Sequence, residues 1–573
     1  MFSSVWNRMW VMHDQVIDMF KFFIGKSTLQ TMVSQHDDGG GSRHSEAAST
    51  NHEHKTESSH ANNSQGGGNG NGDGSNRSYT TRQRIGLILG PLLFIIALIF
   101  LHPGDLSQAG TAIAASTLWI ATWWITEAVP IPVTSLLPLI LFPLTQGLEM
   151  DDAAAAYGDD TIFLFMGGFM IALAMEKWNL HRRIAISIIS AIGTNMNRIV
   201  LGFMVATGFL SMWISNSATA MMMVPIGLAI IYQVSDSLDE NRTPETTKAE
   251  TSFSKALMLG IAYSASIGGI STLIGTPPNS LFKGAVSQIY GMDISFAQWM
   301  LFGVPFAWIF ILVAWFYLIK FAFPNKIKSL PGGRAVIDDE KKQLGTSSSE
   351  EKLVFTVFIL AALAWITRSF LLEKIFPDIT DGTIAMIFAV LLFIIPAINI
   401  KGDRLLDWAT AVKLPWGILL LFGGGLSIAE GFEDSGLSKW LGLQLSALEG
   451  VHIIIVITAV TALVIFLTEI TSNTATASMM FPIMASLASA LSVHPYGLMV
   501  AAGVAASCAF MLPVATPPNA VVFGSGYLEI NDMAKAGFWL NIFGIILVVL
   551  AVYFLFPVVW GIDLNTLPDA FKN

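Results

Sequence analysis

Two polar segments that recur in an apolar chain hold the side chains best suited to bind ions. The segment SNSATA at 215–220 returns as SNTATA at 472–477, and the flanking residues extend the match to 8 of 11 positions. Each copy is followed by a second shared segment, TPPN, at 276–279 and again at 516–519. Because the same two motifs occur twice in the same order, we infer an internal duplication with one half-site in each half.

Hydroxyl and carboxamide groups at a break in a helix can bind charges of either sign. Such groups donate hydrogen bonds to a carboxylate, whereas backbone carbonyls freed by the break accept a hard cation such as Na⁺. The two prolines of each TPPN segment lack an N–H group, so they break a helix and leave carbonyl groups unclaimed. Another hydroxyl, on Ser211 and on Thr468, precedes each SN pair by four residues. This spacing predicts a cation held between a helical hairpin and a broken helix.

Charge is scarce around both motifs. Neither contains Lys or Arg, so an anion bound there must be neutralised by helix dipoles and by cations bound beside it, which favours cation-coupled entry. Glu469, beside the second tip, is either a proton or cation site or the partner in a structural contact. Helix packing and capping is the alternative role for the hydroxyls. It explains Asn216 and Asn473 poorly, because burying an amide without a partner is costly.

The composition predicts an all-α polytopic membrane protein. Hydrophobic residues make up 53% of the 573 residues and charged residues only 13%, far from the balance of soluble proteins. Backbone inside a bilayer must satisfy its own hydrogen bonds, so the long apolar runs are expected to be helices. The single cysteine, Cys508, excludes an intrachain disulfide and reads as a small buried side chain.

The apolar runs predict 11 transmembrane helices plus two re-entrant helical hairpins in an inverted repeat. The first half, 81–323, contains a hairpin at 200–233 whose two arms are too short to cross individually, and the second half, 353–573, contains a hairpin at 453–491. A polar insert at 235–254 and a cytoplasmic linker at 324–352 separate apolar runs. The expected spans lie at 85–101, 112–128, 131–148, 161–178, 255–273, 299–323, 354–372, 383–398, 414–429, around 517–518, and 538–559.

Two further segments and an orientation follow from composition. Residues 1–34 have apolar side chains at helical spacing and predict an interfacial amphipathic helix, and 35–80 are rich in Gly, Ser, Asn and His and predict a disordered linker. Lys and Arg gather in alternate loops, which predicts a cytoplasmic N-terminus and an external C-terminus. We expect a multi-pass protein of a bacterial inner membrane.

The paired SN(S/T) and TPPN motifs resemble the divalent anion/sodium symporter family, the sodium-coupled di- and tricarboxylate and sulfate transporters, over roughly 85–565. The resemblance implies a homodimer whose protomers each have a scaffold domain and a transport domain that moves as an elevator. It implies Na⁺ as the coupling ion, no other cofactor, a small dianionic substrate, the lipid bilayer as surroundings and no nucleic acid partner.

The resemblance also assigns site residues. The first sodium site would be formed by Ser211, Ser215, Asn216 and a carbonyl at Gly275, and the second by Thr468, Asn473 and carbonyls at Thr471 and Ala515. The substrate carboxylates would meet Asn216, Ser217, Thr276, Pro277, Asn473, Thr474, Thr516 and Pro517. This chain has Ser217 where the family has threonine, which leaves the substrate preference open and the coupling intact.

The main hypothesis is Na⁺-coupled symport of C4-dicarboxylates such as succinate, fumarate and malate into the cell. A Na⁺-coupled citrate or sulfate carrier and a Na⁺-independent dicarboxylate exchanger of the same fold are the alternatives. A membrane enzyme or a sensor is disfavoured, because the sequence has no HExxH motif, no cysteine pair and no segment that reads as a folded soluble domain. The ion stoichiometry stays open.

Overall fold

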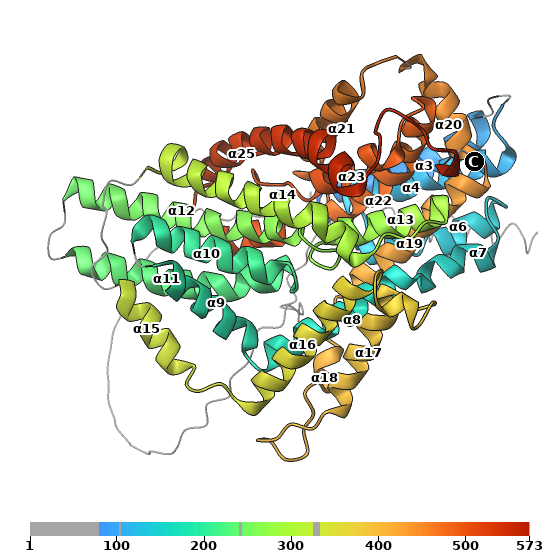
Figure 1. The fold of residues 1–573 in the computed structure, drawn as a ribbon. Helices are drawn as coiled ribbons and strands as arrows, with labels where there is room; N and C mark the ends of the chain where they lie inside the picture. The colour runs from blue at the N-terminus through green and yellow to red at the C-terminus, as the bar shows by residue number, and fades with distance from the viewer. Residues whose placement is uncertain are drawn as a thin grey trace, which may run out of the picture. The chain divides into compact units, whose positions relative to one another are not determined.

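The computed structural model describes residues 79–571 apart from 102, 104, 194, 240–242, 325–332 and 449. The predicted amphipathic helix at 1–34 and nearly all of the predicted linker at 35–80 lie outside the described residues. Within those residues, helices make up the regular structure, and one isolated bridge joins Pro396 to Arg404 (Figure 1). The all-α prediction is therefore confirmed for the part of the chain that is described.

The helices of the first half run in chain order to the end of α14. They are α3 (Thr81–Phe100), α4 (Gln108–Thr126), α5 (Ile131–Thr134), α6 (Pro138–Leu144), α7 (Met150–Ala155), α8 (Asp160–Lys177), α9 (Leu180–Ile192), α10 (Met196–Ser211), α11 (Asn216–Asp239), α12 (Pro244–Gly269), α13 (Pro277–Tyr290) and α14 (Phe296–Tyr317).

The second half begins after α15 (Gly333–Gln343). Its helices are α16 (Ser349–Thr367), α17 (Asp381–Ile394), α18 (Trp408–Ala411), α19 (Trp416–Asp434), α20 (Leu437–Leu445), α21 (Ile453–Thr468), α22 (Asn473–Ala490), α23 (Pro495–Ala506), α24 (Pro517–Phe523), α25 (Ile530–Leu550) and α26 (Phe556–Trp560). One π-helical turn follows α14 and another follows α25, at Leu318–Ala322 and Ala551–Leu555.

The duplication is visible in how the helices pack. In each half a hairpin lies against its own broken helix: α10 and α11 pack on α12, and α21 and α22 pack on α23. The short helices beyond the breaks then cross to the other half, because α13 packs on α22 and α24 packs on α11. The two halves therefore interlock around their helix breaks.

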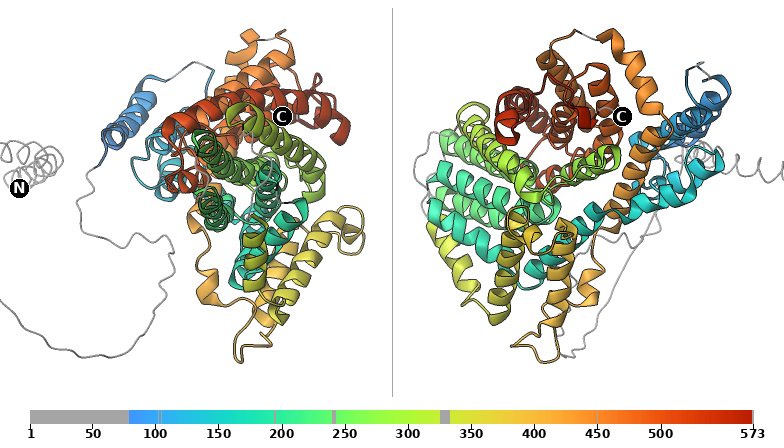
Figure 2. Two further views of the ribbon diagram at one scale, coloured as in Figure 1. Left: turned by 90° about the vertical axis from the view of Figure 1, so that its left-hand side faces the viewer. Right: turned by 45° about the vertical axis from the view of Figure 1, so that its right-hand side comes forward.

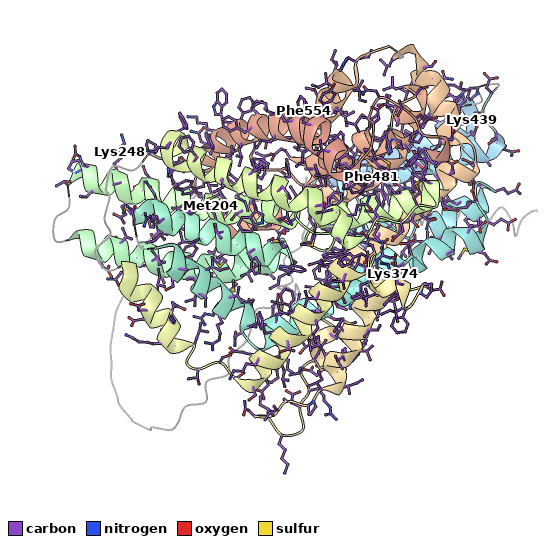
Figure 3. The ribbon with its side chains drawn as sticks, in the orientation of Figure 1. Met204, Lys248, Lys374, Lys439, Phe481 and Phe554 are labelled. Carbon is purple, nitrogen blue, oxygen red and sulfur yellow. The ribbon has the colours of Figure 1, made fainter. Side chains whose placement is uncertain are left out.

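Among the described residues, five helical stretches are long and apolar enough to cross a membrane by themselves, judged by length and composition. They are Thr81–Phe100, Met150–Lys177, Asn216–Asp236, Phe296–Ala322 and Ile530–Trp560. Large apolar side chains are exposed on the last of them, as expected of lipid-facing side chains. Val558 is one, and Phe554, labelled in Figure 3, is another. Shorter apolar helices accompany these stretches, and the count of 11 spans stays a prediction.

Three predicted segments differ from the structure. The span expected at 131–148 is divided into α5 and α6, because prolines at 130, 132, 138 and 143 interrupt the helical hydrogen bonds. The arm of the first hairpin expected to end at 233 continues to Asp239 as a helix of 24 residues, so the expectation that neither arm could cross alone is wrong for this arm. The linker at 324–352 contains α15. An ion pair of 2.5 Å between Arg182 and Glu340 joins α15 to α9.

The polar insert at 235–254 is largely helical in its described residues. Thr243 caps α12 through a capping box with Thr246, and Pro244 occupies the first turn, where its missing N–H costs nothing. The cap starts α12 eleven residues before the predicted start at 255. The polar character of this stretch therefore marks the exposed end of a long helix.

Candidate functional site

The first hairpin ends in an unwound tip at 212–215. α10 ends at Ser211 and α11 begins at Asn216, so both residues border the tip. The Ser211 hydroxyl donates to Oδ1 of Asn216 and lies 2.7 Å from the carbonyl oxygen of Ala265 on α12. Ser211 is completely buried. The predicted hydroxyl thus lies one turn below the tip and joins the hairpin to the broken helix.

The second hairpin repeats this contact at the tip 469–472. α21 ends at Thr468 and α22 begins at Asn473. The Thr468 hydroxyl donates to Oδ1 of Asn473 at 2.7 Å and to the carbonyl oxygen of Ala506 on α23 at 2.9 Å. The correspondence between the halves therefore extends from residue identity to individual hydrogen bonds.

The asparagine that ends each TPPN segment ties down the unwound backbone before it. Nδ2 of Asn279 lies near three carbonyl oxygens of the first break, those of Gly269 (3.2 Å), Ile270 (3.1 Å) and Thr272 (2.7 Å). Nδ2 of Asn519 donates to two carbonyl oxygens of the second break, those of Ala509 (3.1 Å) and Leu512 (3.0 Å). Sequence reasoning assigned no role to these asparagines, although their place in a repeated tetrapeptide was the available signal.

Glycines let the backbone close around Asn216. A Cβ atom added at Gly269 would lie 2.7 Å from Oδ1 of Asn216 and 2.9 Å from the carbonyl oxygen of Gly275. A Cβ atom at Gly268 would collide with the backbone of Gly208 on α10. A side chain at either position would therefore force α12 away from the hairpin.

The carboxamide of Asn216 lies among oxygen atoms. With its nitrogen turned toward them, it donates to the carbonyls of Gly275 (3.2 Å) and Ala265 (3.1 Å) and to the Ser211 hydroxyl. With its oxygen turned toward them, four oxygens converge on one small volume, which is a donor set suited to a hard cation. The predicted first sodium ligands Ser211, Asn216 and Gly275 are thus brought together.

A cavity of about 850 Å³ lies where the two tips and the two helix breaks meet. Most of the predicted site residues line it. These are Ser215, Asn216, Ser217, Gly275, Thr276, Pro277, Thr471, Asn473, Thr474, Ala515, Thr516 and Pro517. The remaining two, Ser211 and Thr468, lie buried behind the wall and reach it through their asparagines.

The N-terminal ends of several helices converge on this cavity. α11, α13 and α22 begin at Asn216, Pro277 and Asn473, all three of which line the wall. A helix N-terminus carries a partial positive charge and free N–H groups, so it stabilises a bound anion. The cavity therefore combines oxygen clusters suited to cations with helix ends suited to an anion.

Comparison with known proteins decides the family. Residues 83–562 match the family described as the sodium:sulfate symporter transmembrane region. The chain belongs to this family. The resemblance inferred from the paired motifs is therefore confirmed, and the symporter family accounts for the duplicated half-sites.

Relatives of this chain are found in staphylococci. The sodium-dependent dicarboxylate transporter SdcS of Staphylococcus saprophyticus is 52% identical over 493 residues, which cover 86% of this chain and 94% of the relative. SdcS of Staphylococcus aureus strain MRSA252 is 52% identical over 492 residues, with 85% and 94% coverage. Both are named as transporters, in agreement with the prediction that the chain is not an enzyme.

Among solved structures, MtrF of Neisseria gonorrhoeae, described as illuminating a class of antimetabolite efflux pumps, has a similar fold. The TM-score is 0.50 with 12% sequence identity, and the match covers 83% of this chain and 95% of MtrF. At this identity the likeness concerns the fold alone.

Glu469 makes structural contacts beside the second tip. Its carboxylate accepts hydrogen bonds from the backbone N–H groups of Phe510 (2.7 Å), Met511 (2.9 Å) and Leu512 (3.2 Å), and from Nδ2 of Asn541 (2.8 Å). Four donors occupy its two oxygens and fix the unwound segment that follows α23. Of the two alternatives for this residue, the structural contact is the one observed.

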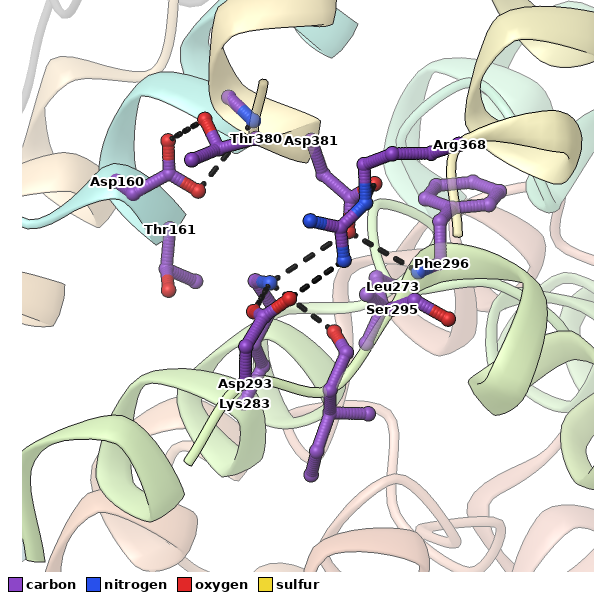
Figure 4. Close-up of polar contacts among 12 residues, drawn as sticks. Asp160, Thr161, Leu273, Lys283, Asp293, Ser295, Phe296, Arg368, Thr380 and Asp381 are labelled. Carbon is purple, nitrogen blue, oxygen red and sulfur yellow. Dashed lines mark hydrogen bonds and ion pairs between the residues drawn. The ribbon is translucent and has the colours of Figure 1, made fainter. Parts of the chain in front are cut away.

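A buried group of charges anchors α13, whose first residues line the cavity (Figure 4). Asp381 is fully buried at the start of α17. Its carboxylate lies 2.8 Å from Nε of Arg368 and 3.5 Å from Nζ of Lys283, and it accepts a hydrogen bond of 3.0 Å from the backbone N–H of Phe296. Asp293 pairs with both cations. The network connects α13 to α16 and α17 and holds its half-helix in place.

Part of the cavity wall comes from outside the duplicated motifs. Sequence reasoning missed these residues, which come from α3, from α8, from the segment after α4 and from the region around α19. They are Thr80, Arg82, Gln83, Thr126, Glu127, Ile131, Pro132, Phe165, Phe169, Pro415, Gly417, Ile418 and Leu421. Weaker repeats, WIT at 124–126 and 365–367 and LFxGG at 164–168 and 421–425, include Thr126, Phe165 and Leu421. The other positions have no such signal, and only the folded structure brings them to the site.

Proposed function

We propose that this chain is a Na⁺-coupled symporter that imports C4-dicarboxylates such as succinate, fumarate and malate by alternating access. The observation that carries the proposal is the cavity in which two SN tips and two helix breaks offer cation ligands and anion donors together. The staphylococcal relatives, 52% identical and matched over 94% of their length, are named sodium-dependent dicarboxylate transporters.

The first sodium ion would lie among Ser211, Ser215, Asn216 and the carbonyl of Gly275. The contact of the Ser211 hydroxyl with both Asn216 and Ala265 supports this assignment, because it draws oxygens of the hairpin and the broken helix together. By the same argument the second ion would be held by Thr468, Asn473 and the carbonyls of Thr471 and Ala515, and the Thr468 contacts support it.

The anion would lie between the two sodium sites. Its carboxylates would accept hydrogen bonds from Asn216, Ser217, Asn473 and Thr474, with Thr276, Pro277, Thr516 and Pro517 beside them. All of these groups are neutral, and the helix N-termini at Asn216, Pro277 and Asn473 supply only partial charge. A dianion deep in a membrane is costly, so the co-bound cations supply the missing neutralisation and thereby couple the two gradients.

Movement between the membrane faces would follow an elevator mechanism in a homodimer. The interlocked hairpins and broken helices form a unit that could move together, since α13 packs on α22 and α24 on α11. The remaining helices, α3 among them, would form the scaffold. The protein would reside in a bacterial inner membrane with its N-terminus in the cytoplasm and its C-terminus outside.

Uptake by purified protein in proteoliposomes tests the proposal. Radiolabelled succinate should accumulate when a Na⁺ gradient points inward and should not when choline replaces Na⁺. Uptake that is as fast in choline as in Na⁺ and that requires internal dicarboxylate would indicate exchange instead of Na⁺-coupled symport. Complete competition by a modest excess of sulfate or citrate, with weak competition by fumarate and malate, would replace the substrate class.

A further inference from the structure

The cavity wall contains a cation that the repeated motifs lack. Among the described residues that line the cavity, only Arg82 and Glu127 carry a formal charge. Arg82 lies in the first turn of α3 and Glu127 directly follows the end of α4, both outside the duplicated segments. Within the described part of the chain, Arg82 makes no ion pair with a carboxylate, and its observed partners are backbone carbonyls.

The position of Arg82 is fixed by its neighbours. Thr80 caps α3 through a capping box with Gln83, and Nε2 of Gln83 donates to the carbonyl of Glu127 at 3.2 Å. α3 lies at the edge of the described helices in both further views, coloured blue (Figure 2). Its first turn nevertheless reaches the site, because these contacts hold it against the end of α4.

The guanidinium reaches the second hairpin. Nη2 of Arg82 donates to the carbonyl of Ile470 at 2.9 Å and to the carbonyl of Ile125. Ile470 belongs to the tip 469–472 and directly precedes Thr471, one of the proposed sodium ligands. Both contacts use Nη2, so Nε and Nη1 keep N–H donors that a carboxylate can accept in a charge-assisted hydrogen bond.

We propose that Arg82 is a substrate-recognition residue that binds a carboxylate of the dianion on one side of the membrane only. The inference rests on the proposed function, since it assumes a dicarboxylate in this cavity. Arg82 meets the tip through the first turn of α3, so it can act only when the cavity opens toward the side where α3 begins, the predicted cytoplasmic side. On that side it retains the anion and, by like-charge repulsion, weakens Na⁺ binding at the neighbouring second site.

The test compares Arg82→Gln with Arg82→Lys and with Arg84→Gln. Arg84 lies two residues further along α3, is exposed and does not line the cavity, so it controls for a general loss of positive charge. Zero-trans succinate transport is measured in right-side-out and in inside-out vesicles, each at low and high ionic strength. Detergent-solubilised size-exclusion profiles establish that each variant is folded.

Arg82→Gln should raise the KM for succinate roughly tenfold on the side where α3 begins, the scale of one lost charge-assisted hydrogen bond. The KM on the other side should stay within about twofold of wild type, since Arg82 does not meet the anion there. In Arg82→Gln the Na⁺ concentration for half-maximal transport should fall on the affected side. Arg82→Lys should recover most of the affinity for succinate, and Arg84→Gln should match wild type.

Unchanged KM values on both sides would overturn the assignment, and so would equal increases on both sides, which indicate a distorted site. If Arg82→Gln does not fold, Arg82→Met takes its place, because it also removes the charge and keeps an unbranched side chain, and unchanged KM values on both sides again overturn the assignment. Absence of Na⁺-driven uptake by the wild-type protein would instead reject the proposed function, so the two failures are distinguishable.

Discussion

Gly269 provides a test of the first sodium site that leaves every proposed ligand in place. Replacement by alanine adds one methyl group, and its Cβ atom would lie 2.7 Å from Oδ1 of Asn216 and 2.9 Å from the carbonyl oxygen of Gly275. Ordinary contact begins at 3.4 Å, so Asn216 or the backbone must move by about 0.7 Å. The variant therefore shifts two proposed ligands without changing their chemistry.

The size of the effect follows from that displacement. Metal sites tolerate deviations of only about 0.2 Å in their ligand distances, so a shift of about 0.7 Å opens the cluster. Overpacking of this kind costs ~1–3 kcal/mol, and each ~1.4 kcal/mol is a tenfold change in affinity. We expect the Na⁺ concentration for half-maximal succinate uptake to rise between about fivefold and a hundredfold.

The assay is the Na⁺ dependence of initial uptake rates in proteoliposomes at saturating succinate. Gly544→Ala is the matched control, because its added Cβ atom meets Phe310 at 3.4 Å, an ordinary contact, on α25 away from the cavity. Melting temperatures measured without Na⁺ separate a change in ion binding from a general loss of stability. A Na⁺ dependence of Gly269→Ala equal to that of Gly544→Ala would refute the first site as drawn.

Three further predictions concern other parts of the site. Asn216→Ala and Asn473→Ala should each abolish Na⁺-driven uptake with normal membrane expression, because each removes a group that serves both an ion and the anion; wild-type kinetics in either would contradict the site. Glu469→Gln should lower the melting temperature and leave the Na⁺ dependence of uptake unchanged. An amide cannot accept hydrogen bonds from all four donors, and each donor left unpaired costs ~1–3 kcal/mol. A changed Na⁺ dependence would make Glu469 an ion site. Asp381→Asn should destabilise the protein by about 1–3 kcal/mol, since it removes the buried carboxylate that Arg368 and Lys283 share and leaves Arg368 only the partly exposed Asp293 and Glu373. Chemical denaturation in detergent measures the change, and a loss below about 1 kcal/mol would be too small for this buried group.

The sequence predicted the parts of the site that are repeated. Polar tips such as Asn216 and Asn473 stand out in an apolar chain, and proline pairs mark a helix break on physical grounds. The same reasoning could not find Arg82, because a single arginine at the start of an apolar run also has the ordinary function of a membrane-interface anchor. Its contact with Ile470 joins residues 388 positions apart, and only tertiary packing creates it.

Helix boundaries were predicted less well than motifs. The stretch at 235–254 was interpreted only as a polar insert before a helix that begins at 255, yet its capping box at Thr243 and its proline at position 244 are helix-start signals that were readable from sequence. The division of 131–148 into two helices was likewise encoded by its prolines. In both segments the local positions of prolines and capping residues determined the helix boundaries, and the average polarity was a poorer guide to them.

The two halves share the order of their motifs and the contacts of their hairpins but differ at their helix breaks, and this difference bears on how two ions would bind. Counted back from TPPN, the first half has Gly269 and Gly275 where the second has Ala509 and Ala515. In the first half the glycines let the backbone close directly on Asn216. In the second half methyl groups occupy the corresponding positions, and Glu469 holds the unwound segment from the opposite end. The first cluster is therefore closed by its own backbone, whereas the second depends on side chains around the tip, where the charge of Arg82 also acts. Duplication set the two half-sites opposite each other, and these few substitutions make them unequal.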